Sequence, residues 1–217
     1  MKRCFGFCLA CCASLLCACG SRYAVSVDSL RDPDAPVAGG PCLLIPGNAD
    51  VAPGDLLFRE VIRMLEPAFR KAGYPPAPQR DGAAYVAKIS YWPGEPVATV
   101  KTGIERRYQP IRYWNKVRYV PVEWTIVTER TVYPAHLLLE CYAAVPSSPG
   151  DPAAPEERLG PQVWRTKVSV SGKRDDFRAL LAVAAATLNG TLGTRTDGAR
   201  HFKVVMADDG EFSVSEN

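Results

Sequence analysis

The chain has 217 residues, of which 47% are hydrophobic and 23% are charged, and its formal net charge is +3. The overall charge gives no support for nucleic-acid binding. The 199 residues from Cys19 to Asn217 are enough for one compact domain with a sizeable core. The unusual feature is the distribution of cysteine, because six of the eight cysteines lie in the first nineteen residues.

The first segment predicts export and lipid attachment. Two basic residues, Lys2 and Arg3, precede an uncharged apolar run at residues 5–18. As a helix this run spans ~21 Å, less than the ~30 Å of a membrane core, which favours a signal peptide over a membrane span. The sequence Leu16-Cys17-Ala18-Cys19 resembles the lipobox of bacterial lipoproteins. The resemblance implies cleavage before Cys19 and attachment of palmitate-type acyl chains to its thiol.

One alternative for this segment is an ordinary cleaved signal peptide without lipid attachment, and another is a zinc or iron–sulfur cluster held by the cysteines. Such sites place paired ligands on polar turns, often with histidine nearby. Here the cysteines lie in an apolar run, and the first histidine is His136. Because cysteine also behaves as a small apolar residue, the lipid-attachment hypothesis is favoured, and no metal site is predicted. Removal of residues 1–18 lowers Lys plus Arg from 26 to 24 against 23 acids, so the mature net charge is about +1.

Two further cysteines, Cys42 and Cys141, remain in the mature chain. Disulfides persist in exported proteins, and this one would close a loop of about 100 residues, worth roughly 4–5 kcal/mol in the chain-entropy model. The alternative is a pair of buried free thiols on strands. The sequence leaves both readings open.

The first half of the mature chain predicts a linker, a strand, a helix and a second strand. Residues 19–40 include one short alternating stretch and otherwise read as a lipidated N-terminus and linker, rich in Pro, Asp and Gly. An apolar strand is expected at 42–45. Apolar residues at three- and four-residue spacing predict a helix from Asp55 to Gly73, kinked or split at Pro67.

The second half is predicted to be rich in strands. Separate extended segments are expected between residues 97 and 145, because Pro110, Pro121 and Pro134 interrupt them. A proline-rich surface loop over 146–161 precedes an alternating strand and a second helix that begins near Asp175. The strands expected in the mature chain include 84–91, 117–120, 122–127, 136–144, 163–170 and 202–207. A turn is expected at 208–210.

Two helices, each with one apolar face, and about six strands predict an α+β fold. The expected architecture is a two-layer sandwich in which both helices cover one face of a mixed sheet. The predicted organisation is a lipoprotein signal peptide at 1–18, a lipidated linker at 19–40 and a single domain at 41–217.

Several short motifs occur in order along the chain: Leu44-Ile45-Pro46-Gly47-Asn48, Asp55-Leu56-Leu57-Phe58-Arg59-Glu60, Ala72-Gly73-Tyr74, Trp164-Arg165-Thr166, Ser171-Gly172 and Asp176-Phe177-Arg178. Together they resemble a family of small bacterial envelope lipoproteins that is catalogued only as a domain of unknown function. The resemblance covers most of residues 42–196 and implies an envelope location and a small α/β domain. It assigns no catalytic residues.

One segment, from Lys101 to Arg118, combines basic and aromatic residues and contains a single acid, Glu105. Arginine and aromatic rings together bind phosphates and stack on planar groups. In an exported protein this pattern indicates an anion-binding surface for a lipid headgroup or an acidic envelope partner, while the alternative is a solvated hairpin. The candidate residues are Arg106, Arg107, Arg112, Lys116, Arg118, Tyr113 and Trp114.

No catalytic motif accompanies this surface. The two mature histidines, His136 and His201, lack ligand-like spacing, and phosphate-loop and nucleophile-elbow motifs do not occur. We therefore expect no catalytic residues, no cofactor and no nucleic-acid partner. The expected function is a non-enzymatic adaptor or binding module held in the envelope by its acyl chains. Gly20, rather than Asp, follows Cys19, and by resemblance to the sorting of lipoproteins in enteric bacteria this favours the outer membrane, facing the periplasm. The alternative is an envelope hydrolase acting on cell wall or lipid.

Overall fold

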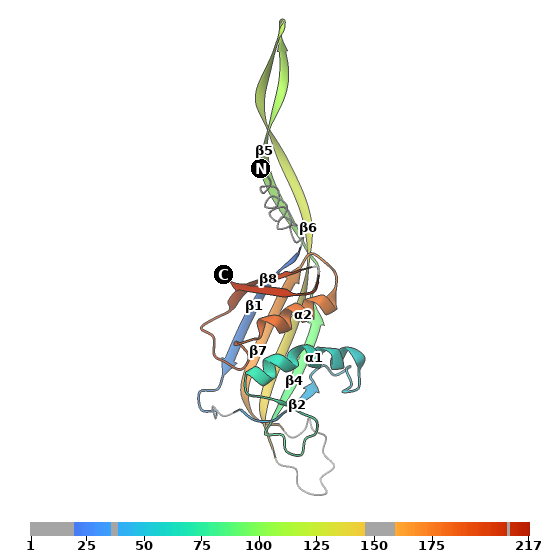
Figure 1. Cartoon of the computed structure of the whole chain (residues 1–217), viewed down its shortest axis with the longest axis vertical. Coiled ribbons are helices and arrows are strands. Elements are labelled where there is room, and N and C mark those ends of the chain that lie inside the picture. Colours follow the sequence, from blue (N-terminus) through green and yellow to red (C-terminus); the bar gives the residue numbers. More distant parts are fainter. Residues whose placement is uncertain (1–19, 36–38, 146–158, 208) are drawn as a thin grey trace, which may run out of the picture.

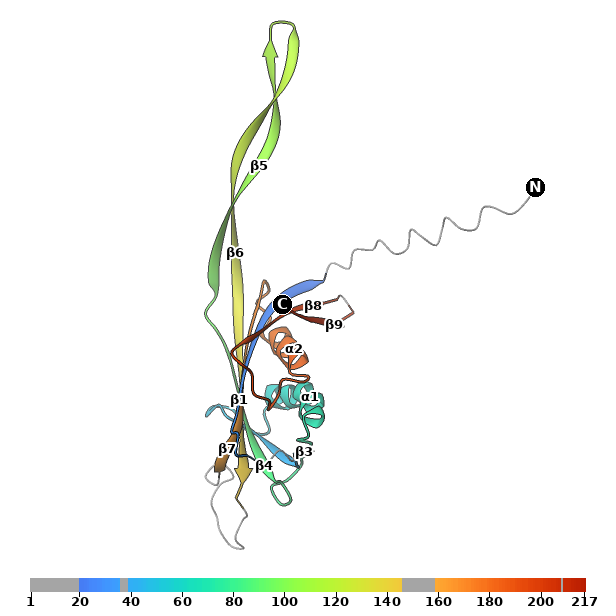
Figure 2. The same cartoon turned by 90° about the vertical axis from the view of Figure 1, so that its left-hand side faces the viewer.

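The computed structural model describes residues 20–35, 39–145, 159–207 and 209–217. These residues form a mixed, open sheet of nine strands with two helices packed on one of its faces (Figures 1 and 2). The prediction of a mixed sheet with two helices is confirmed. The predicted count of about six strands is too low, because two strands at the sheet edges and one in a long hairpin were not recognised.

The strand order is β3-β2-β4-β6-β7-β1-β8-β9, and β5 pairs with β6 outside this path. Strands β2, β3 and β4 are parallel, and α1 lies in the chain between β2 and β4. All other pairs are antiparallel. The strands are β1 (Ser21–Arg31), β2 (Cys42–Pro46), β3 (Pro76–Ala77), β4 (Tyr85–Pro93), β5 (Val97–Tyr113), β6 (Lys116–Ala144), β7 (Leu159–Gly172), β8 (Arg200–Met206) and β9 (Phe212–Glu216).

Helix α1 (Leu56–Lys71) begins where the sequence predicts, because Asp55 caps it. The Asp55 carboxylate accepts hydrogen bonds from the backbone N–H groups of Leu57 (2.9 Å) and Phe58 (3.1 Å). The helix continues through Pro67. Gly73, at φ +86°, then ends it in a conformation that glycine adopts without strain.

Helix α2 (Phe177–Thr187) is capped in the same way by Asp176, whose carboxylate accepts from the Ala179 backbone N–H at 3.0 Å. Its apolar face packs on the sheet beside α1, and the side chains that it buries include Leu180, Leu181 and Val183. Both helix starts were therefore predictable from an acidic cap that precedes an apolar periodic pattern.

The core lies between the helices and one face of the sheet. Trp164 of β7 is its largest fully buried side chain, and its ring lies 6.0 Å from that of Phe69 and 5.6 Å from that of Tyr74. Beside it, the Ser29 and Thr166 hydroxyl groups are 2.7 Å apart and hydrogen-bonded. Burial of large aromatic rings therefore fixes the helices over the middle of the sheet.

Strand β1 corrects the predicted domain boundary. Residues 21–31, expected within the linker at 19–40, form a strand that pairs with β7 on one side and β8 on the other. Tyr23, Val25 and Val27 alternate with exposed or half-buried residues and enter the core. The folded domain therefore begins before residue 41, because β1 supplies core side chains in the interior of the sheet.

Strand β6 is a single element of 29 residues, so the expectation of separate strands at 117–120, 122–127 and 136–144 is wrong. Pro121 lies in the part that pairs only with β5, where a strand has an open edge that tolerates a missing N–H. Pro134 lies where β6 passes into the body of the sheet and is in register with Ser171 of β7. Prolines at edges and transitions did not end the strand.

Two expectations lie outside the described residues. They are the lipoprotein signal peptide at 1–18 with Cys19, and residues 146–158 of the expected surface loop. Of the helices in the described ranges, neither is long and apolar enough to cross a membrane.

Replacement of Asp55 by Ala tests the capping of α1. The change removes the acceptor for two backbone N–H groups and should lower the free energy of unfolding by about 1 kcal/mol. Urea unfolding followed by circular dichroism measures the loss. Asp81→Ala is the matched control, because Asp81 is exposed in a turn. An equal loss in both variants would show that the cap contributes nothing specific.

Candidate functional site

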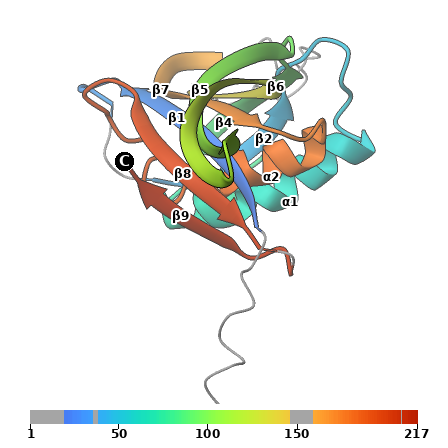
Figure 3. The same cartoon turned by 90° about the horizontal axis from the view of Figure 1, so that it is seen from above.

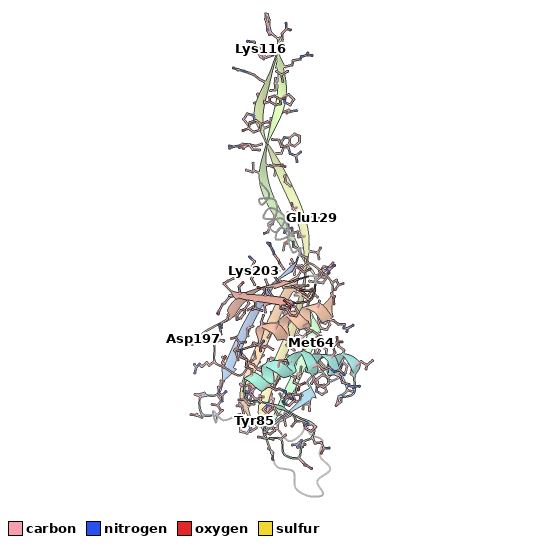
Figure 4. All side chains as sticks on the ribbon, viewed as in Figure 1. Met64, Tyr85, Lys116, Glu129, Asp197 and Lys203 are labelled. Carbon is pink, nitrogen blue, oxygen red and sulfur yellow. The ribbon has the colours of Figure 1, made fainter. Side chains whose placement is uncertain are left out.

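The candidate site is a two-stranded ribbon that projects from one end of the body (Figures 1 and 2). The ribbon consists of β5 and residues 116–132 of β6, which pair in continuous register from Val97↔Val132 to Tyr113↔Lys116. Figure 4 shows Lys116 at its far end and Glu129 near its base. The predicted anion-binding residues all lie on this ribbon, in its outer part.

A two-residue turn, Trp114-Asn115, closes the ribbon. Trp114 has φ +53°, a left-handed conformation that turns usually assign to glycine or asparagine. Its side chain is 92% exposed. Among the described residues, the most exposed large aromatic ring thus lies at the apex of the ribbon, in a backbone conformation that is costly for a bulky residue.

Within the described ranges, the ribbon carries most of the exposed large hydrophobic side chains. Of the 19 exposed large hydrophobic side chains among the described residues, 13 lie between residues 97 and 127. They include Ile104, which is 73% exposed, and Tyr113, which is 72% exposed. A two-stranded ribbon is marginally stable in water on its own. Contiguous exposed apolar side chains of this kind mark interaction surfaces.

Two of the predicted cations are already in ion pairs. Arg106 contacts Glu123 across the ribbon at 3.0 Å, and Arg107 contacts Glu105 at 2.9 Å. The hydrogen bond to Glu105 raises the pKa of Arg107 above its usual range. By contrast, no described residue forms an ion pair with the other three cations. Those cations are Arg112, Lys116 and Arg118, which surround the turn.

The charge is segregated along the ribbon. Between residues 106 and 122 there are five basic residues and no acid. The remaining part, 97–105 with 123–132, has Lys101 and Arg130 against three glutamates. The outer half is therefore strongly cationic and the inner half nearly neutral, so an anionic partner is attracted to the tip.

A groove lies at this tip. Its volume is about 550 Å³, and it is lined by Ile111, Tyr113, Lys116, Val117, Arg118 and Val120. The pairs Ile111↔Arg118 and Tyr113↔Lys116 place most of the lining on one face of the ribbon, because paired residues share a face. We call this feature the tip groove. It combines two unpaired cations with an apolar floor.

The candidate disulfide is not present, since Cys42 and Cys141 are both free and buried. Cys42 lies on β2 and Cys141 on β6, with β4 between them. Two strand spacings are ~10 Å, beyond the ~7 Å between α-carbons that a bridge allows. The Cys42 thiol, followed by burial, raises the pKa of Cys141. Both thiols lie in the core as free, buried side chains.

The two histidines lie in one row on the face of the sheet opposite the helices. The row runs His136, Ser169, Ser26, His201 across β6, β7, β1 and β8, so the histidines are about three strand spacings, ~14 Å, apart. His136 Nδ1 lies 3.1 Å from Ser169 Oγ. Burial, followed by the charge of Lys167, lowers the pKa of His136. His136 and Ser169 thus form a neutral cross-strand pair. The ~14 Å between the two histidines keeps their imidazoles from acting on one substrate atom.

A metal centre is not assembled within the described ranges, where no three His, Cys, Asp or Glu side chains gather closely enough to hold an ion. A shallower cavity of about 320 Å³ borders the histidine row and is lined in part by Ser26, Ser169, Ser171 and His201. The ribbon thus brings together the basic and aromatic residues predicted from the sequence. Sequence reasoning missed Ile111, Val117 and Val120, which share the groove through strand register alone.

Comparison with known proteins gives little further information. No family model matches the chain, and no curated protein matches it. Two solved structures of the PelC dodecamer from Paraburkholderia phytofirmans, one of them a single-substitution variant, align with 79% of this chain and 99% of theirs. Their identities are 11% and 12%, with TM-scores of 0.38 and 0.37. At these values the similarity defines neither a shared fold nor a shared function.

Thiol labelling tests the two buried cysteines. In the folded protein Cys42 and Cys141 should resist iodoacetamide, and in urea without reductant both should react, because they are buried but not bridged. Site-resolved mass spectrometry measures the labelling. Asp81→Cys supplies an exposed thiol that should react in the folded state. Cysteines that react in urea only after reduction would demonstrate the disulfide instead.

Proposed function

We propose that this protein is a membrane-anchored lipoprotein of the bacterial envelope that acts as a non-enzymatic adaptor or binding module. The proposed anchor is a set of acyl chains on Cys19, and the proposed location is the outer membrane, facing the periplasm. Two or three buried acyl chains give lasting attachment, whereas one alone is marginal. The remaining residues supply a compact body and one projecting contact element.

The observation that carries the binding role is the ribbon. Its exposed aromatic and β-branched side chains contribute nothing to the core of the body. Three cations near its turn have no ionic partner among the described residues. Exposed apolar surface and uncompensated charge both cost stability in an isolated protein, and a bound partner removes both costs. A contact role therefore accounts for the ribbon better than a structural one.

The position of Gly20, the first described residue, supports an anchor at the end of the body from which the ribbon projects. Ala24 of β1 is in register with Ser171 of β7, which is in register with Pro134, two residues beyond the ribbon. Gly20 precedes β1 at that end, and a side chain there would lie 2.8 Å from the Met206 carbonyl oxygen. A lipidated Cys19 would thus join the body with almost no slack.

Lipid attachment is tested by labelling cells with radioactive palmitate. The protein should incorporate label, and Cys19→Ala should lose it and leave the outer-membrane fraction. Cys17→Ala is the matched control, since Cys17 precedes the expected cleavage site and should not carry an acyl chain in the mature protein. Unchanged incorporation in Cys19→Ala would remove the anchor from the proposal.

The contact role is tested by shortening the ribbon. Residues 106–123 are replaced by Asn-Gly, which joins the cross-strand pair Glu105 and Trp124 through a two-residue turn. The shortened chain should keep its unfolding midpoint and its membrane fractionation. In intact cells, the crosslinking yield of any envelope component that crosslinks to the full ribbon should fall at least tenfold with the shortened chain. Recovery of the same components at the same yield would contradict the contact role.

A further inference from the structure

The tip groove has the chemistry of a site for an anionic amphiphile. Lys116 and Arg118 provide charge on the face that also carries Ile111 and Tyr113. The volume of about 550 Å³ lies within the ~300–1,000 Å³ range of small-ligand sites. An inorganic anion would leave the apolar floor in water, and an apolar ligand would leave the cations unpaired. A ligand with a phosphate next to hydrocarbon satisfies both.

The side chains around the groove are those found at membrane interfaces. Trp114 stands at the apex, with Tyr113 beside it on the groove face and Tyr119 on the opposite face of the ribbon, all of them exposed. Trp and Tyr concentrate at the headgroup level of bilayers, where an apolar ring with a polar edge is favoured. Basic residues near an anionic leaflet add about 1 kcal/mol each. Aromatic anchoring and charge attraction thus act together at one end of the ribbon.

A second copy of the chain fits this surface less well. Two ribbons side by side in the same direction would bring the three cations without an ion pair, Arg112, Lys116 and Arg118, against the same three of the other copy. Like charges at this spacing repel. An anionic surface meets the same residues with attraction. The charge pattern therefore selects a partner of opposite sign.

We infer that the tip groove, together with Trp114, docks on the headgroups of anionic phospholipids at a membrane surface. The inference rests on the proposed function, because an acyl anchor beside Gly20, at the base of the ribbon, keeps the whole ribbon within reach of a bilayer. A ribbon of this length is ~55 Å long, more than the ~40–45 Å of a whole bilayer. The open edges of a single ribbon exclude it from hydrocarbon. The ribbon therefore lies along the surface, and its tip enters the headgroup layer.

Vesicle binding tests the docking site in the full chain carrying Cys19→Ala, so that no acyl chain contributes. Binding to phosphatidylcholine vesicles that contain phosphatidylglycerol should exceed binding to phosphatidylcholine alone. The double change Lys116→Gln and Arg118→Gln should weaken binding to the anionic vesicles about thirtyfold, because each cation contributes about 1 kcal/mol. Cosedimentation at fixed ionic strength measures both.

The matched control is the double change Arg59→Gln and Arg63→Gln, which removes the same charge from exposed positions on α1. It should alter binding less than threefold. Trp114→Gly relaxes the left-handed turn and removes the ring, so it should fold normally and lose most of the fluorescence quenching by brominated phospholipid. Since every variant carries the same residues 1–18, differences between variants report the tip.

Several results would overturn the inference. One is equal binding to both vesicle types, and another is an equal loss in the α1 control. A third is a chain that binds soluble polygalacturonate but no anionic vesicle, which would identify an acidic polymer as the partner. A fourth is a dimer that dissociates in the Lys116→Gln, Arg118→Gln variant while vesicle binding is unchanged. Because no acyl chain is present, failure here leaves the lipid-anchor proposal standing, and failure of palmitate labelling leaves this test valid.

Discussion

The structure depends on strand β6, which pairs with β4 and β7 in the body and with β5 alone in the ribbon. The inner part of β6 lies between β4 and β7 in the body, where Leu137, Leu139 and Cys141 face the helices. Its outer part pairs with β5 alone and is exposed on both faces. Burial of the inner part fixes the register and direction of the outer part. The body therefore presents the ribbon, and the apolar core that holds the helices also determines where the ribbon projects.

The body and the ribbon differ in role because their aromatic side chains have different surroundings. In the body, large aromatic rings such as Trp164 are fully buried and fill the space beneath the helices. In the ribbon, aromatic rings such as Trp114 are exposed and stand beside unpaired cations. Figures 1 and 2 show the ribbon rising from one end of the body beyond both helices, and Figure 3 views it end-on from above. The same residue types thus serve packing in one region and contact in the other.

Some of this organisation could be predicted from the sequence, and the reasons are local. The helices were predictable because Asp55 and Asp176 precede apolar residues at helical spacing. The effect of Pro121 on its strand was not predictable, since it depends on whether β6 pairs there with one neighbouring strand or two. Likewise, the basic segment was evident, but its free cations were not. Arg106 is neutralised by Glu123, seventeen residues away, through a register that only the turn position defines.

The central position of β6 has a mechanical consequence. A pull on the ribbon enters the body directly along β6, and from β5 through the three irregular residues 94–96 into β4. Within the body, that force reaches a strand hydrogen-bonded on both sides, so the ladders to β4 and β7 bear the load together in shear. An edge strand would instead be peeled away one bond at a time. The ribbon can therefore transmit a pull or a push to the body without separating the strands of the sheet.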